Sequence, residues 1–234
     1  MKDIPLEKRI IFALDVPSFE EAKRWVERLS PYIKFYKVGL ELFLACGFPV
    51  VEWIRERGCE VMLDLKLFDI PATVKRAIYQ IKDRGVTYTT VHGNDGILRA
   101  AVEAKGDLKV LAVTVLTSLD ESDIKDLGFQ CSIEDLVLSR AKRAFELGCD
   151  GVVASGRELK AIRHKIGEGL IVVVPGIRPV ENRDVDDQKR TITLREAFMW
   201  GADHVVVGRP LRNSPEPEKT AQRMLEEVKE VLGI

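Results

Sequence analysis

Apolar, β-branched runs alternate with amphipathic helical patterns along the whole chain. Residues 19–29 illustrate the helical pattern, because apolar side chains recur there at spacings of three and four after the capping residue Ser18. The β-branched runs are apolar on both faces, as expected for parallel strands covered by helices. Eight such runs are the predicted strands: residues 10–16, 36–42, 61–67, 88–92, 109–116, 151–154, 170–174 and 204–207.

Eight strand–helix units predict a (β/α)8 TIM barrel, formed by residues 1–234 as a single domain. The 234-residue length suits one such domain. The alternative is an open, doubly wound parallel sheet. The barrel is favoured because eight units close a barrel, and because no G-x-G-x-x-G motif follows the first strand.

The third predicted strand carries an acid and a base. Asp64 and Lys66 alternate with leucines, so both side chains are expected on one face of the strand. Asp69 follows just before Pro71, where a helix can begin. Charges are costly to bury unless they are paired, so this crowding indicates either a functional site or a salt bridge that holds a loop.

Other predicted strand ends also carry polar residues. In a TIM barrel, the carboxyl ends of the strands and the loops after them build the active site. His92 lies at such a position but has no metal-ligand partners at a readable spacing, so we expect it to pack or to form hydrogen bonds. The further candidates at this end of the barrel are Asp15, Lys37, Thr117, Ser118, Ser155, Arg178, Gln188 and Arg209.

The last two strands are followed by features typical of a phosphate site. Gly208 allows backbone N–H groups to approach an anion, and Arg209 provides a two-pronged donor. A second glycine and Arg178 follow the seventh strand. Ordinary turns with surface arginines are the alternative. The charged segment 177–192 is long for a connection, which predicts a lid that brings Gln188 onto the phosphate, or else a solvated loop.

Composition narrows the possible partners. The chain has 36 basic and 37 acidic residues, so its charge gives no reason to expect nucleic acid or a membrane surface. No apolar run approaches the roughly 18 residues of a membrane span, and no signal-peptide core is present. Four isolated cysteines suggest a reducing compartment. We therefore expect a cytoplasmic protein.

Taken together, these motifs resemble the orotidine 5′-phosphate decarboxylase family over nearly the whole chain. The D-x-K-x-x-D-I-P run that begins at Asp64 is highly specific, and weaker motifs follow the family's order. The weaker motifs are Ala-Leu-Asp ending at Asp15, Lys-Val-Gly from Lys37, Val-Thr-Val-Leu-Thr-Ser ending at Ser118, Pro-Gly-Ile-Arg ending at Arg178, Asp-Gln ending at Gln188, and Val-Gly-Arg ending at Arg209.

The resemblance implies conversion of orotidine 5′-phosphate to UMP and CO₂ without a metal or an organic cofactor. Lys66 would place positive charge at pyrimidine C6 and then protonate it, and Asp64 would lie beside the departing carboxylate. The catalytic residues implied by the family are a network of alternating charges: Lys37, Asp64, Lys66 and Asp69.

The resemblance also assigns substrate contacts. Asp15 and Lys37 would bind the ribose, and Thr117 or Ser118 would contact the pyrimidine edge. Asp69 and Thr73 would reach into the neighbouring site of a homodimer. The predicted phosphate ligands are Arg178, Gln188, Gly208 and Arg209, and the third-strand segment expected at the substrate is Asp64, Leu65, Lys66, Leu67, Phe68, Asp69, Ile70, Pro71, Ala72 and Thr73.

Two other functions remain open. Hexulose-phosphate synthases and keto-gulonate-phosphate decarboxylases share D-x-K-x-x-D, but they use Mg²⁺, which Asp64 and Asp69 would hold here, and an enediolate intermediate. The Ile70–Thr73 continuation and Gln188 favour the nucleotide enzyme. A non-catalytic protein that binds a phosphorylated ligand on the same scaffold is the second alternative.

Overall fold

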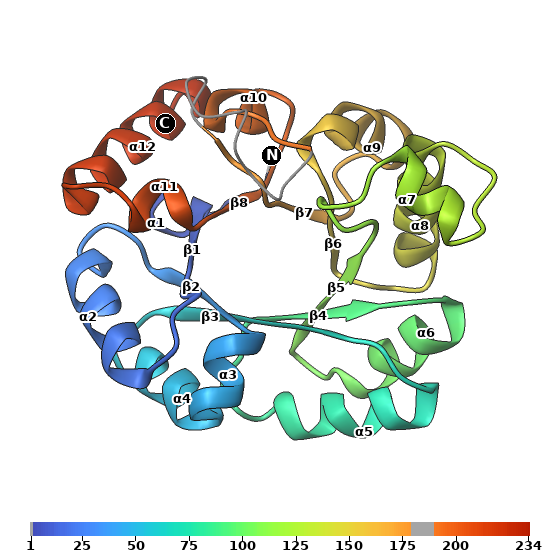
Figure 1. Ribbon diagram of the computed structural model, residues 1–234, viewed down its shortest axis with the longest axis horizontal. Coiled ribbons are helices and arrows are strands. Elements are labelled where there is room, and N and C mark those ends of the chain that lie inside the picture. The colour runs from blue at the N-terminus through green and yellow to red at the C-terminus, as the bar shows by residue number, and fades with distance from the viewer. Residues whose placement is uncertain (1, 179–189) are drawn as a thin grey trace.

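The computed structural model describes residues 2–178 and 190–234, which form a closed barrel of eight parallel strands (Figure 1). The strands pair in sequence order, and the first also pairs with the last. The predicted barrel is therefore confirmed, and the open sheet is excluded. The strands are β1 Ile10–Ala13, β2 Phe35–Gly39, β3 Glu60–Leu67, β4 Tyr88–His92, β5 Lys109–Val113, β6 Gly151–Val153, β7 Ile171–Val174 and β8 His204–Val207.

Helices surround the barrel on its outer face (Figure 1). The helix that follows β1 begins where predicted, with the Ser18 hydroxyl accepting the backbone N–H of Glu21. Three helices of seven residues or fewer were not predicted (α1, α3 and α11), because so few residues carry little periodicity. The helices are α1 Leu6–Arg9, α2 Phe19–Leu29, α3 Leu40–Cys46, α4 Phe48–Glu56, α5 Pro71–Ile81, α6 Asp95–Ala104, α7 Glu121–Asp126, α8 Ile133–Glu146, the 3-10 helix η1 Gly156–Glu158, α9 Leu159–Ile166, α10 Leu194–Met199, α11 Arg209–Arg212 and α12 Pro217–Leu232.

Three strands end three residues earlier than predicted. The apolar runs 10–16, 36–42 and 109–116 leave the sheet after Ala13, Gly39 and Val113. Most apolar residues beyond these ends remain buried, as Leu14 and Leu42 show with no exposed surface, although Leu40 is 55% exposed. Apolar character therefore marked burial and not strand pairing, because the turns and helices after these strands also pack against the core.

The barrel interior is filled at its amino end. Phe35 and Tyr88 pack there against the ring of His204, which lies at the start of β8. The Tyr88 hydroxyl lies 2.9 Å from His204 Nε2, and His204 Nδ1 lies 2.8 Å from the carbonyl of Lys8. Because that carbonyl can only accept, Nδ1 carries the proton and Tyr88 donates to Nε2. The open space is therefore left at the carboxyl end.

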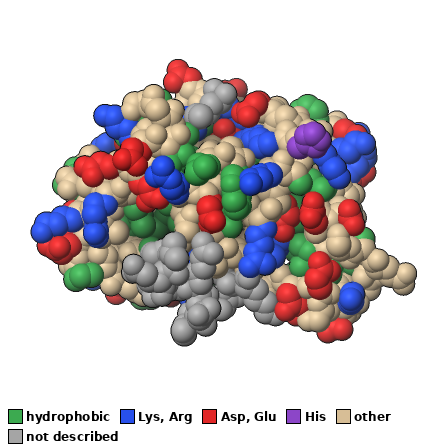
Figure 2. Space-filling model, turned by 90° about the horizontal axis from the view of Figure 1, so that it is seen from above, with side chains coloured by type: hydrophobic (Ala, Val, Ile, Leu, Met, Phe, Trp, Pro, Cys, Tyr) green, Lys and Arg blue, Asp and Glu red, His purple; other side chains and the backbone are tan. Residues whose placement is uncertain are grey.

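Charges of both signs are interspersed over the face drawn in Figure 2. Among the described residues, none of the helices has both the length and the apolar character of a membrane span. The four cysteines are free, and burial raises the pKa of the Cys149 thiol to about 12. That thiol is consequently a packing residue.

Candidate active site

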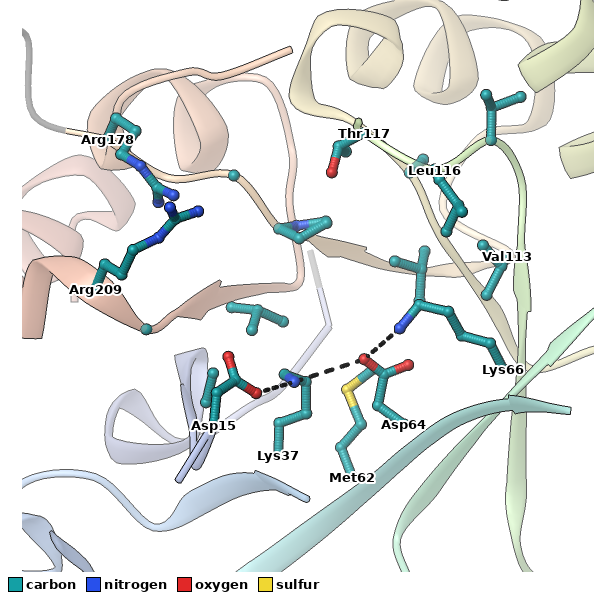
Figure 3. Close-up of a pocket in the computed structure, with 18 of the residues that line it drawn as sticks. Asp15, Lys37, Met62, Asp64, Lys66, Val113, Leu116, Thr117, Arg178 and Arg209 are labelled. Atoms are coloured by element: carbon teal, nitrogen blue, oxygen red, sulfur yellow. Dashed lines mark hydrogen bonds and ion pairs between the residues drawn. The ribbon is translucent and has the colours of Figure 1, made fainter. Parts of the chain in front are cut away.

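A pocket lies at the carboxyl end of the barrel, where the predicted polar residues converge. Its walls come from strand ends around most of the barrel and from the loops that follow them (Figure 3). The lining residues are Ala13, Asp15, Lys37, Met62, Asp64, Lys66, Val113, Val115, Leu116, Thr117, Val153, Ala154, Pro175, Gly176, Arg178, Val206, Gly208, Arg209 and Arg212.

Acids and bases alternate along one wall of this pocket (Figure 3). Lys37 Nζ lies 2.8 Å from Asp15 Oδ1 and 3.8 Å from Asp64 Oδ2. Lys66 Nζ lies 2.8 Å from the same Asp64 oxygen. The predicted acid and base of β3 therefore do meet, and Asp15 and Lys37 from β1 and β2 extend the row.

Asp64 is the most deeply buried member of the row, with 8% of its surface exposed. Burial by itself raises the pKa of this carboxyl group. The charges of Lys37 and Lys66, with hydrogen bonds from Lys66 and Thr90, outweigh burial and hold the pKa below its ordinary value of 3.8. Asp64 is therefore a carboxylate at neutral pH, which places a fixed negative charge beside the Lys66 ammonium.

The backbone at Lys66 has an unusual conformation. Within residues 2–178 and 190–234, Lys66 is the only non-glycine residue with a positive φ, 48°. The pairing of β3 with β4 shifts register between Leu63 and Leu67, on either side of it. Non-glycine residues in this region carry strain of order 1–3 kcal/mol, and such strain is concentrated at functional sites.

Thr90 on β4 holds this segment, and the sequence analysis missed it. Its hydroxyl accepts the backbone N–H of Lys66 at 2.9 Å and donates to Asp64 Oδ1 at 2.8 Å. Thr90 has no exposed surface. The signal that could have pointed to it is the pair of threonines, Thr89 and Thr90, on the predicted buried strand after the charged one.

Two arginines lie across the pocket from Lys66. Arg178 follows β7 and Arg209 follows β8, and Figure 3 shows their guanidinium groups close to one another. Gly208 is the N-cap of α11, the short extra helix after β8. A side chain at Gly208 would bring its Cβ within 3.3 Å of Ala13 Cβ, so glycine allows the backbone to approach β1 closely. This end of the pocket suits an anionic group.

Arg212 also lines the cationic end of the pocket and was not predicted. It lies on α11 and donates a hydrogen bond to the backbone carbonyl of Asp15. No sequence motif distinguishes it from a surface arginine, because its contact depends on the closure of β8 onto β1.

The structure separates the two candidates for the pyrimidine contact. Thr117 lines the pocket beside Leu116 (Figure 3). Ser118 is exposed to solvent and lies outside the described lining. Gln188, predicted to contact the phosphate, lies outside the described residues.

Apart from Asp64 and Lys66, the residues of the segment 64–73 lie outside the pocket lining of their own chain. Leu65 and Leu67 pack against the hydrophobic core outside the barrel. Asp69 is exposed and accepts the backbone N–H of Ile70 at 2.6 Å, and Thr73 accepts a hydrogen bond from Arg76 at 3.3 Å. The other members of this segment, also outside the described lining, are the exposed residues Phe68, Ile70, Pro71 and Ala72.

His92 and Ser155 have structural contacts. The His92 ring packs on Phe68 with their centres 5.6 Å apart, and burial, helped by nearby Arg140 and Lys66, lowers its pKa. The predicted packing role of His92 is therefore confirmed. The Ser155 hydroxyl caps η1 by accepting the N–H of Arg157 at 3.2 Å.

Comparison with known proteins identifies the family. Residues 8–224 match the model of the orotidine 5′-phosphate decarboxylase / HUMPS family. The chain is 54% identical to the orotidine 5′-phosphate decarboxylase of Methylococcus capsulatus, over 99% of this chain and 96% of that protein. It is 45% identical to the protein of the same name from Xanthomonas euvesicatoria pv. vesicatoria, over 96% of this chain and 93% of that one.

A solved structure supports the same family assignment. The crystal structure of orotidine 5′-phosphate decarboxylase from Lactobacillus acidophilus superimposes with a TM-score of 0.84 at 32% identity, covering 94% of this chain and 99% of that one. With the sequence matches and the shared barrel, this likeness establishes that the chain is a member of the orotidine 5′-phosphate decarboxylase / HUMPS family.

Proposed function

We propose that this enzyme converts orotidine 5′-phosphate to UMP and CO₂ without a metal or an organic cofactor. The observation that carries the proposal is the pocket itself, which pairs the Lys66 ammonium with Asp64 at 2.8 Å on one wall and places Arg178 and Arg209 on the other. A ligand with a reacting ring at one end and a phosphate at the other matches this distribution of charge.

Lys66 is proposed to act on the carbon that loses CO₂. Breaking the bond between C6 and its carboxylate leaves an electron pair on C6, and no adjacent carbonyl delocalises it. A preorganised ammonium group stabilises that charge as it forms. The same group then transfers its proton to C6, which completes UMP.

Asp64 is proposed to destabilise the bound substrate before CO₂ leaves. Its fixed negative charge would lie near the substrate carboxylate, and their repulsion is relieved when CO₂ leaves. Asp64 also stabilises the ammonium charge of Lys66 at 2.8 Å. Lys37, between Asp15 and Asp64, balances both carboxylates before the substrate binds.

Contacts to the remaining substrate groups are proposed from the resemblance to the family and from the residues that line the pocket. We assign the ribose hydroxyls to Asp15 and Lys37, and the pyrimidine edge to Thr117 with Ser118 nearby. The phosphate is assigned to Arg178, Gly208 and Arg209, with Gln188 retained on the strength of the sequence alone. Binding energy from a remote phosphate can lower the barrier of the chemical step when it is used to order the reacting end.

We further propose that the enzyme is a homodimer with shared sites. The segment 64–73, which lies outside the pocket lining apart from Asp64 and Lys66, exposes 70% of Phe68 and 65% of Ile70. Large apolar side chains exposed together favour a protein interface, and a second copy related by twofold symmetry is the simplest partner. That arrangement would carry Asp69 and Thr73 into the partner's pocket.

The magnesium-dependent members of the family remain the second candidate. Asp64 fits that chemistry poorly, because one of its oxygens is paired with Lys66 and the other accepts the Thr90 hydroxyl. Within the described part of the chain, no group of three or more His, Cys, Asp or Glu residues is arranged to hold a metal ion. Two lysines beside Asp64 also repel a divalent cation.

The deciding experiment follows the ultraviolet absorbance of orotidine 5′-phosphate in metal-free buffer. Consumption at the same rate with and without EDTA is expected. Activity that EDTA abolishes and Mg²⁺ restores would favour the metal-dependent chemistry. UMP binding without CO₂ release would favour the non-catalytic alternative.

A further inference from the structure

Arg190 is a buried charged residue that the proposed chemistry does not use. Its Nη1 lies 2.8 Å from Oε1 of Glu158, which belongs to η1 after β6. The two side chains expose only 5% and 7% of their surface. Arg190 is absent from the described pocket lining, so it does not face the ligand.

This ion pair is not expected to contribute much to the stability of the fold. Removing two charges from water costs about as much as their attraction returns. Glu158 Oε2 and Arg190 Nε are, in addition, buried without a hydrogen-bond partner among the described residues. Burying a polar atom without a hydrogen-bond partner is itself destabilising. The pair is therefore better explained by where it holds the chain.

The other contacts of Arg190 reach the wall of the pocket that carries Thr117. Its Nη2 donates to the carbonyl of Val115 at 3.1 Å and to that of Leu116 at 3.2 Å. Val115, Leu116 and Thr117 are consecutive lining residues after β5. One guanidinium group thus fixes the backbone immediately before Thr117.

The chain that follows Arg190 holds the wall that carries Arg178. Ile192 forms a bridge with Ile177, and its carbonyl accepts the backbone N–H of Arg178 at 2.9 Å. The Ile192 side chain packs against Gly156, where an added Cβ would lie 1.9 Å from Ile192 Cδ1. Ile192 is therefore held in one position, two residues from Arg190.

We propose that Arg190 is a positioning residue that couples the phosphate end of the pocket to its pyrimidine end. It joins the backbone before Thr117 to the short bridge that holds Arg178, through Glu158 of the intervening η1. When a ligand phosphate orders Arg178, the same rigid unit holds the Thr117 wall in place. This inference rests on the proposed function for the identity of the two ligand groups.

The chain offers a matched control at the other end of the barrel. Arg163 lies 2.7 Å from Asp203 and also donates to the carbonyls of Gly201 and Leu170, at 2.8 and 2.9 Å. Its side chain is 10% exposed. Arg163→Met and Arg190→Met therefore each remove a buried guanidinium group, one carboxylate pair and two or more carbonyl contacts.

The test measures the dissociation constants of UMP and uridine by calorimetry for the wild type and both variants. For each protein, the dissociation constant of uridine divided by that of UMP reports how far the phosphate assists binding of the base. Arg190→Met is expected to lower this ratio roughly tenfold, within the range of measured coupling between sites. Arg163→Met is expected to change it less than about threefold, even where it lowers the melting temperature.

A ratio that stays within about threefold of the wild type in Arg190→Met overturns the proposal. If that variant does not fold, Arg190→Lys is judged by the same limit, because an ammonium group keeps the Glu158 pair but cannot also span both carbonyls. Since the readout is binding, a failure of the coupling appears in the ratio. A failure of the proposed function appears instead as absent CO₂ release by the wild type.

Discussion

The hydroxyl of Thr90 donates a hydrogen bond of 2.8 Å to Asp64 across the β3–β4 ladder. The same oxygen accepts the backbone N–H of Lys66, so it contacts both the acid and the chain that carries the base. This double contact lies where φ at Lys66 is positive and the strand register shifts. Thr90 lies outside the described pocket lining, and its role is therefore to position the charged pair.

Replacing Thr90 with valine is expected to lower kcat/KM for orotidine 5′-phosphate by roughly 10- to 100-fold. The side chain keeps its shape, but Asp64 loses a donor and the strained backbone loses its acceptor. Stability to denaturant is expected to fall by about 1–3 kcal/mol. Thr89→Val is the control, because Thr89 is equally buried and donates to the Leu63 carbonyl at 3.1 Å. Equal losses of activity in the two variants would contradict a positioning role.

Lys66→Ala is expected to reduce kcat by roughly 10⁴-fold or more, because both charge stabilisation and proton transfer are removed. UMP should still bind, since Arg178 and Arg209 on the opposite wall are untouched. Turnover and calorimetric UMP binding are the two measurements. Lys23→Ala, which removes an exposed pair with Glu20, is the control. Decarboxylation retained by Lys66→Ala would remove this residue from the mechanism.

Arg209→Ala is expected to weaken UMP roughly 100-fold and uridine less than threefold, because a charge-assisted contact to phosphate is lost and the nucleoside has none. Competition binding of both ligands measures the difference. Arg195→Ala serves as the control, since Arg195 forms an exposed pair with Glu230 at 3.3 Å. If UMP and uridine weakened by the same factor, the phosphate assignment would be wrong.

His204 is expected to make stability depend on pH. Burial, opposed by the Lys8 carbonyl and Asp203, lowers its pKa to about 4 from the ordinary 6.5. Between these values the unfolded chain binds the proton and the folded protein does not, so the stability that neutral His204 contributes is present above pH 6.5 and is lost as the pH falls towards 4. The loss is about 3 kcal/mol.

Chemical denaturation at several pH values between 7 and 4 measures how steeply the free energy of unfolding changes with pH. His204→Gln should be less stable at pH 7 but should lose less stability on acidification than the wild type. His164→Gln is the control, because His164 is exposed to solvent. If the stability of His204→Gln fell with pH as steeply as that of the wild type, a group other than His204 would be responsible for the pH dependence.

Shared sites in a dimer predict recovery of activity on mixing two inactive variants. Lys66→Ala and Asp69→Asn damage different parts of a site, so a hybrid dimer with crossed contributions has one site free of substitutions. Random exchange makes about half of the dimers hybrids, which gives about one quarter of wild-type activity. Activity after unfolding and refolding the mixed variants is the measurement. No recovery, with dimers present by light scattering, would place Asp69 in the site of its own chain.

The sequence predicted the barrel well because its eight repeats are periodic signals that local hydrophobicity carries. It misplaced the ends of β1, β2 and β5, because residues after a strand can be as buried as those within it. It also missed α1, α3 and α11, which are too short to show a period.

For the site, the sequence by itself determined the chemistry that lies close together along the chain. The alternation of β3 placed Asp64 and Lys66 on one face, and glycine–arginine pairs marked the cationic end of the pocket. Only the tertiary structure decided which distant residues hold that chemistry in place. Thr90 is 24 residues from Lys66, and Arg190 is 75 residues from Val115. Such contacts depend on strand register and barrel closure, and no local pattern records them, because a buried hydrogen bond is defined by its partner and not by its neighbours in sequence.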